Sequence, residues 1–148
     1  MSNFRNVSSM YWNFGLVDAS SGIPRLIEDD TARFRLKALL EELQELEEGY
    51  QEKNLPKIAD SLVDLVVFAL GTAVLHNLPW EDLFAEVMRA NNDKIPQFSK
   101  LKERNGTTGS IDLIKPANWK GPDIEKVLSS CGWINPDAAR LEDEINLR

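Results

Sequence analysis

The stretch that decides the fold is "IADSLVDLVVFALGTAVL", residues 58–75. It is an almost unbroken apolar run with Asp64 in its middle and Asp60 one helical turn earlier. A carboxylate among Val, Leu and Phe side chains is costly to bury unless something pairs with it. The run is apolar on nearly every side, which predicts a helix starting near Pro56 that is central in the fold or buried in a subunit interface. The partner of Asp64 therefore bears directly on function.

Helical spacing of apolar residues continues on both sides of this run. Residues 31–50 repeat leucines at helical intervals, with Asp30 or Thr31 as the expected N-cap. Residues 78–94 form a further helix that Pro96 ends. A short helix is expected within 7–16 and a loop over 18–30. After residue 96 the sequence is rich in Gly, Pro, Asn and Lys, which predicts a loop with one short hairpin, a small helix at 122–130 and a polar tail, helical or irregular.

These elements predict an all-α protein with a four-helix-bundle-like fold. We expect a single domain over residues 1–148, with a core of about 31–95 and an irregular C-terminal extension of about 96–148. The apolar helix at 56–76 cannot be covered by a unit of this size alone, which predicts a homodimer or homotetramer.

Composition excludes several function classes. The chain has 17 basic and 24 acidic residues and a net charge of -7, which disfavours binding to nucleic-acid polymers or anionic membranes. One cysteine permits no internal disulfide and fits a cytoplasmic location. The N-terminus lacks the form of a signal peptide, and the longest apolar stretch, Leu65 to Leu75, is shorter than the roughly 20 residues that span a bilayer.

Acidic residues occur at helical spacing on two consecutive helices. Asp60 and Asp64 share one face of the apolar helix, and Glu41 and Glu45 share one face of the preceding helix, with Glu42 about 100° away. If the helices pack antiparallel, these carboxylates enter one space and repel one another. Divalent cations such as Mg²⁺, which take oxygen ligands, relieve that repulsion. Alone, the glutamates are more often part of a solvated helix face, and Asp64 alone is more often a paired aspartate in the core. The two motifs together favour a metal site.

A di-iron helical bundle is the competing metal site. Such sites use Glu-x-x-His pairs. No Glu-x-x-His occurs in this chain, and its single histidine, His76, follows Thr72, Ala73 and Val74. The sequence therefore disfavours the di-iron alternative.

Several segments together resemble one enzyme family. "RFRLKALLEELQEL" at 33–46 contains E-E-x-x-E, and the next helix has E-x-x-D with Ser61 in place of the glutamate and Asp60 beside it. "FAEVMRANNDKI" at 84–95 contains Asn-x-x-Lys, and "DLIKPANWKGPDI" at 112–124 has a lysine before a Pro-Asp pair. In the order and spacing of these motifs, over roughly residues 31–128, the chain resembles the all-α nucleoside triphosphate pyrophosphohydrolases, the MazG-like group that includes dimeric dUTPases and phosphoribosyl-ATP pyrophosphohydrolase.

This resemblance implies an enzyme that hydrolyses nucleoside triphosphates between the α- and β-phosphates, giving the monophosphate and pyrophosphate. It implies Mg²⁺ or Mn²⁺ as cofactor and active sites that use residues from neighbouring subunits. The implied catalytic residues and metal ligands are Glu41, Glu42, Glu45 and Asp64, with Asp60 as a further ligand. The residues expected to bind substrate are Arg35, Asn91, Lys94 and Lys115. The cations of the arginine and the two lysines suit phosphate.

The base pocket is expected at "MYWNF", residues 10–14. Trp12 offers a stacking surface worth about 1–3 kcal/mol, and Asn13 has an amide that can read a base edge. We expect deoxynucleotides as substrates, with a preference for guanine because Asn13 can read its edge. The alternative is that Tyr11, Trp12 and Phe14 belong to the core.

The alternative function is a helical interaction protein that kept the fold without catalysis. Ser61, at the position of the usual glutamate, is the residue that best supports it. Release of phosphate from added nucleotide, with and without Mg²⁺, discriminates between the two functions.

Overall fold

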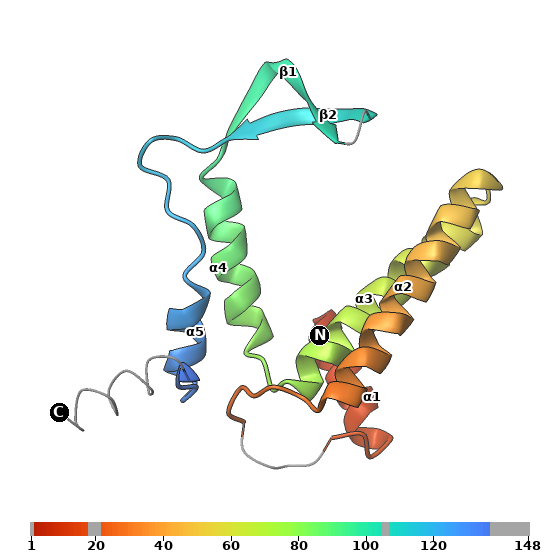
Figure 1. Cartoon of the computed structure of the whole chain (residues 1–148), viewed down its shortest axis with the longest axis vertical. Helices are drawn as coiled ribbons and strands as arrows, with labels where there is room; N and C mark the ends of the chain where they lie inside the picture. The colour runs from red at the N-terminus through yellow and green to blue at the C-terminus, as the bar shows by residue number, and fades with distance from the viewer. Residues whose placement is uncertain (1, 18–21, 105–106, 137–148) are drawn as a thin grey trace. The chain divides into compact units, whose positions relative to one another are not determined.

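The computed structural model describes residues 2–17, 22–104 and 107–136, which fold mostly into helices (Figure 1). The chain forms two compact units, one running to Trp80 and resuming at Leu128, the other covering Glu81–Val127. The elements are α1 (Asn3–Asn13), α2 (Asp29–Gln51), α3 (Leu55–Leu75), α4 (Trp80–Asn92), β1 (Ile95–Arg104), β2 (Thr107–Ile114) and α5 (Ile124–Ser130). The tail beyond residue 136, expected to be helical or irregular, lies outside the described residues.

The two long helices of the first unit, α2 and α3, lie side by side and antiparallel, as the sequence predicted (Figure 1). A short turn joins them, with Lys53 in the left-handed region at φ 54°. Asn54 caps α3 by accepting a hydrogen bond from the Lys57 amide at 3.2 Å, and Pro56 occupies the first turn, where no amide donor is needed. The expected cap of α2 is wrong: Glu28 is the N-cap residue, and Asp29 and Asp30 form the first turn, where their charges favour the helix N-terminus.

The short helix α1 packs against the C-terminal half of α3. Val7 and Tyr11 of α1 and Leu70 and Val74 of α3 form the buried core of the unit. Tyr11 is 5% exposed and lies directly over Gly71, the position where a side chain on α3 would block it. The sequence therefore provides a notch in the apolar helix, and the aromatic residue of α1 fills it.

This notch makes Gly71 a sensitive position. A Cβ added at Gly71 would overlap the hydroxyl and ring of Tyr11. We expect Gly71→Ala to destabilise the fold by about 1–3 kcal/mol, because overpacking displaces a buried aromatic ring. Chemical denaturation followed by circular dichroism measures the change. Gly22→Ala is the matched control, because a Cβ at Gly22 meets no atom within 4 Å. Equal midpoints for the two variants would contradict this packing.

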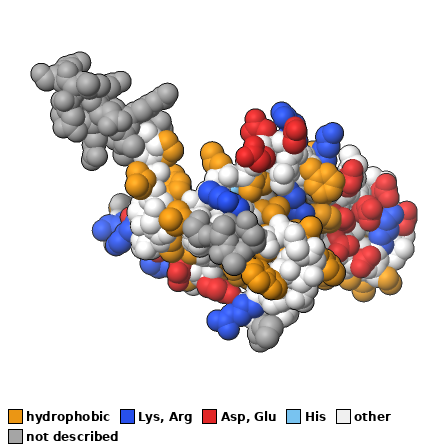
Figure 2. Space-filling view, turned by 90° about the horizontal axis from the view of Figure 1, so that it is seen from below, with side chains coloured by type: hydrophobic (Ala, Val, Ile, Leu, Met, Phe, Trp, Pro, Cys, Tyr) orange, Lys and Arg blue, Asp and Glu red, His pale blue; other side chains and the backbone are white. Residues whose placement is uncertain are grey.

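Much of α3 remains exposed in the single chain. Of the described helices, α3 alone has the length and apolar composition of a membrane span, with 28% of its most apolar window buried. Its 21 residues extend well beyond Leu65 to Leu75, the apolar run that is too short to span a bilayer. The core helix of an assembly has the same composition. Figure 2 shows hydrophobic side chains at the surface among acidic ones.

The second unit consists of α4, a two-stranded antiparallel hairpin and the segment that follows it. The strands β1 and β2 pair from Ile95 opposite Ile114 to Arg104 opposite Thr107, with two irregularities in register. They have 10 and 8 residues, so the hairpin is longer than the short one expected. The segment after β2 returns to α4, where the Glu86 carboxylate accepts a hydrogen bond from the Asp123 amide at 2.9 Å.

Candidate functional site

The packing of α2 on α3 surrounds one acidic side chain, Glu42. This residue is half-buried, and its Oε2 atom is fully enclosed without a hydrogen-bond partner. An enclosed carboxylate oxygen without a donor is a destabilising arrangement that a protein keeps only for a reason. Water, a proton or a cation can supply the partner of such an oxygen.

The negative charges of the other four predicted carboxylates raise the pKa of Glu42. Burial raises the pKa of Glu42 above its ordinary value of 4.5, and the negative charge of Asp64 raises it further. Smaller contributions to the pKa of Glu42 come, in decreasing order, from Glu45, Asp60 and Glu41. These four carboxylates therefore lie close enough to Glu42 to influence its pKa.

No basic side chain neutralises this cluster within the described residues. The lysine nearest in sequence, Lys57, binds Glu48 at 2.8 Å and Glu52 at 3.3 Å instead. The arginine ion pairs join Arg33 to Asp30, and Arg89 to Glu86 and Asp93. For Asp64, whose predicted partners are metal ions and through them Glu41, Glu42 and Glu45, the described residues show the Glu42 carboxylate as a charged neighbour.

The donor set of the cluster fits a hard divalent cation. It offers carboxylate oxygens from two rigid helices, and Mg²⁺ and Mn²⁺ prefer oxygen ligands. As they stand in the described chain, no three His, Cys, Asp or Glu side chains are arranged to hold a metal ion. The fit rests on the enclosed, partnerless Glu42 oxygen and on the mutual repulsion that a cation would relieve.

Ser61, which replaces a glutamate of the family motif, is fully buried at 2% exposure. Its hydroxyl donates to the Lys57 carbonyl at 3.0 Å within the same helix. Ser61 therefore offers no ligand, and the neighbouring Asp60 is exposed and contributes its charge to the cluster instead.

Arg35 does not fit the phosphate-binding role expected for it. Its side chain is inside the fold at 7% exposure, where Nε donates to Thr72 Oγ1 at 3.0 Å and Nη2 donates to the Phe68 carbonyl at 2.6 Å. Its guanidinium also lies 4.8 Å from the ring centre of Phe68 and 5.7 Å from that of Tyr11. The structure corrects the expectation: Arg35 joins α2 to α3 and supports α1.

In the second unit, three expected substrate-binding residues gather around Trp119. Lys94 Nζ donates to Asn91 Oδ1 at 2.7 Å and lies 5.8 Å from the centre of the indole ring. Lys115 Nζ lies 4.3 Å from the same centre. Trp119 was absent from the expected site residues. Its position four residues after Lys115, in "KPANWK", was the only sequence signal for it.

The aromatic residues of α1 separate into core and surface. Tyr11 is in the core, whereas Trp12 and Phe14 are 57% and 69% exposed. Trp12 lines a cavity of about 270 Å³ together with Phe4, Ser8 and Val74, among others. Asn13 is exposed at the end of α1. The ring expected to stack on a base is thus accessible.

The chain matches a model of a known protein family. A family model described as phosphoribosyl-ATP pyrophosphohydrolase matches residues 17–91. This range contains the five clustered carboxylates and Asn91, and it ends before Lys94 and Lys115. No curated protein matches the chain.

Proposed function

From the premise that the chain belongs to the phosphoribosyl-ATP pyrophosphohydrolase family, within the MazG-like superfamily, we propose that it cleaves nucleoside triphosphates between the α- and β-phosphates. The family supports nucleotide pyrophosphohydrolase activity in general terms. The observation that carries the proposal for this chain is the carboxylate cluster around Glu42, whose enclosed oxygen has no protein partner.

The proposed metal ligands are Glu41, Glu42, Glu45, Asp60 and Asp64. Bound Mg²⁺ or Mn²⁺ would neutralise phosphate charge and make a coordinated water more acidic. The carboxylates themselves orient water and accept its proton as its oxygen attacks the α-phosphorus and the bond to the leaving pyrophosphate breaks.

The proposed substrates are nucleoside triphosphates, with deoxynucleotides and dGTP among them. The accessible Trp12 ring and the exposed Asn13 amide support recognition of a nucleobase, because they offer a stacking face and a group that reads a base edge. Lys94 and Lys115 support binding of phosphate, because no acidic side chain pairs with either of them in the described chain.

Anion-exchange chromatography of the products tests the proposal. Full-length protein is incubated with ATP, dATP, dGTP, dUTP and phosphoribosyl-ATP, with Mg²⁺, Mn²⁺ or excess EDTA. Monophosphate is the expected nucleotide product from ATP and the three deoxynucleotides, whereas a diphosphate would indicate cleavage at the γ-phosphate. Full activity in EDTA refutes the metal requirement. If no nucleotide is consumed under any condition, the non-catalytic alternative replaces the enzyme.

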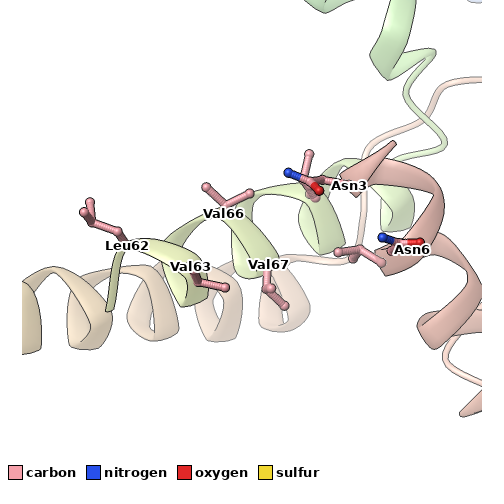
Figure 3. A pocket seen from close by; sticks show the side chains of 8 residues that line it. Asn3, Asn6, Leu62, Val63, Val66 and Val67 are labelled. Carbon is pink, nitrogen blue, oxygen red and sulfur yellow. The ribbon is translucent and has the colours of Figure 1, made fainter. Parts of the chain in front are cut away.

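We also propose that the chain assembles as a homodimer or homotetramer through the exposed apolar faces of its first unit. On α3, Val63 is 61% exposed and Val66 45%. These two valines line a groove of about 400 Å³ between α1 and α3, with Asn3 and Asn6 at its polar side (Figure 3). On α2, Leu36, Leu40 and Leu43 are each more than half exposed. A second copy is the occupant that buries both faces at once.

Light scattering after size exclusion tests the assembly. Wild type at micromolar concentration should have at least twice the chain mass of 16.7 kDa. Val63→Lys should shift the mass toward one chain, because it places a charge in the proposed interface. Leu26→Lys is the matched control, since Leu26 is 88% exposed outside these helices. A mass near 16.7 kDa for wild type refutes the assembly.

A further inference from the structure

Trp119 is held rigidly in the second unit. Its indole Nε1 donates to the Ala90 carbonyl at 2.7 Å, and Ala90, in the last turn of α4, is 1% exposed. The Trp119 amide closes a turn onto the Pro116 carbonyl at 2.9 Å. Both ends of the residue are therefore fixed, which gives its ring a defined orientation.

Two ammonium groups from different elements lie near this ring. Lys115, just after β2, is 4.3 Å from the ring centre, and Lys94, just after α4, is 5.8 Å from it. The electron-rich ring attracts both cations and so favours their positions beside it. The Asn91 amide oxygen further orients Lys94 at 2.7 Å.

The lysines differ from the arginine of the same unit. Arg89 is engaged by Glu86 at 2.8 Å, by Asp93 at 3.0 Å and by the Gly121 carbonyl at 3.1 Å. The Arg89 hydrogen bond and the Asp123 amide lower the pKa of Glu86 to about 2, as expected for a structural ion pair. Within the described part of the second unit, no carboxylate pairs with Lys94 or Lys115. Their charges remain available to an anion.

We infer that Trp119 is a positioning residue that holds Lys94 and Lys115 as a two-ammonium site for a polyphosphate anion. The chemistry favours an anion over a nucleobase, because two cations already lie beside the ring and each of them can donate to phosphate oxygens. The inference rests on the proposed function for the identity of that anion, which is the phosphate chain of a nucleotide or its pyrophosphate product.

Titration of full-length protein with inorganic pyrophosphate, followed by isothermal calorimetry, tests the inference. Trp119→Leu removes the ring face and should weaken binding about fivefold. Trp119→Phe keeps a ring face and should recover part of this loss. Lys115→Met should weaken pyrophosphate binding by itself but add little in the Trp119→Leu background, because both changes remove one interaction. Trp133→Leu is the matched control, since Trp133 is a half-buried tryptophan outside this cluster.

Kinetics with a hydrolysed nucleotide separate positioning from general destabilisation. Trp119→Leu should raise KM by a similar factor and leave kcat nearly unchanged, with the far-UV spectrum retained. If Trp119→Leu does not fold, Trp119→Phe and Lys115→Met decide by the same measurements. The inference is overturned if the folded Trp119 variants, or Lys115→Met, bind pyrophosphate with wild-type affinity and have the wild-type KM. That result leaves the proposed hydrolase activity standing. Trp119-dependent pyrophosphate binding without nucleotide hydrolysis leaves the inference standing and refutes the proposed function.

Discussion

Replacing Asp64 with asparagine is expected to lower nucleotide turnover by about 10²–10⁴-fold, the range for loss of a group that acts directly in proton transfer or on the reacting centre. Of the neighbouring charges, that of Asp64 has the largest effect on the pKa of Glu42. No basic residue in the described chain forms an ion pair with Asp64. Asparagine keeps the shape of the side chain and removes the charge. The helix content should therefore remain, while kcat collapses.

A matched pair of variants separates chemistry from folding in this experiment. Glu47→Gln removes a carboxylate from the same helix as Glu42, at an exposed position that does not contribute to the pKa of Glu42. It should keep wild-type turnover. Initial rates and far-UV circular dichroism are recorded for both variants. If Asp64→Asn turns over nucleotide at nearly the native rate, Asp64 has a structural role and the proposed metal cluster loses its central member.

The sequence was sufficient to predict that these acidic side chains influence one another, because the relevant spacing is local. That they hold a metal ion stays a prediction. Asp60 and Asp64 are one helical turn apart, and so are Glu41 and Glu45. A short turn between two long helices permits little besides antiparallel packing, so two local patterns predicted one tertiary arrangement. The enclosed state of Glu42 then follows from its position between α2 and α3.

Arg35 and Trp119 show where sequence reasoning fails. Arg35 lies 33 and 37 residues from the two acceptors of its side chain, and nothing local distinguishes it from a surface arginine. Trp119 binds the carbonyl of Ala90, 29 residues earlier, across a hairpin whose length was itself unpredicted. The roles of both residues depend on long-range contacts. The apolar pattern of α3 predicts that the helix is buried, but it does not identify the surface that packs against it.

Glu42 provides a test of the metal site that does not require a substrate. The pKa of Glu42 is raised in the folded state, so its contribution to stability is present in full below about pH 4.5 and is lost as pH rises through the folded pKa. At neutral pH the ionised carboxylate therefore opposes folding in the absence of metal. Glu42→Gln removes this charge, and we expect the metal-free variant to melt about 3 °C above wild type.

Addition of a cation should reverse the order of the two proteins. A cation that binds only the folded state at about 100 times its dissociation constant stabilises by about 2.7 kcal/mol, so wild type should gain several degrees in Mn²⁺ or Mg²⁺. Glu42→Gln should lose most of this gain, because it lacks the enclosed oxygen that needs a partner. Differential scanning calorimetry in EDTA and in each cation measures both effects, with Glu47→Gln as the control. If metal-free Glu42→Gln melts below wild type and responds equally to cations, Glu42 is held by a protein partner, and the cluster is not a cation site.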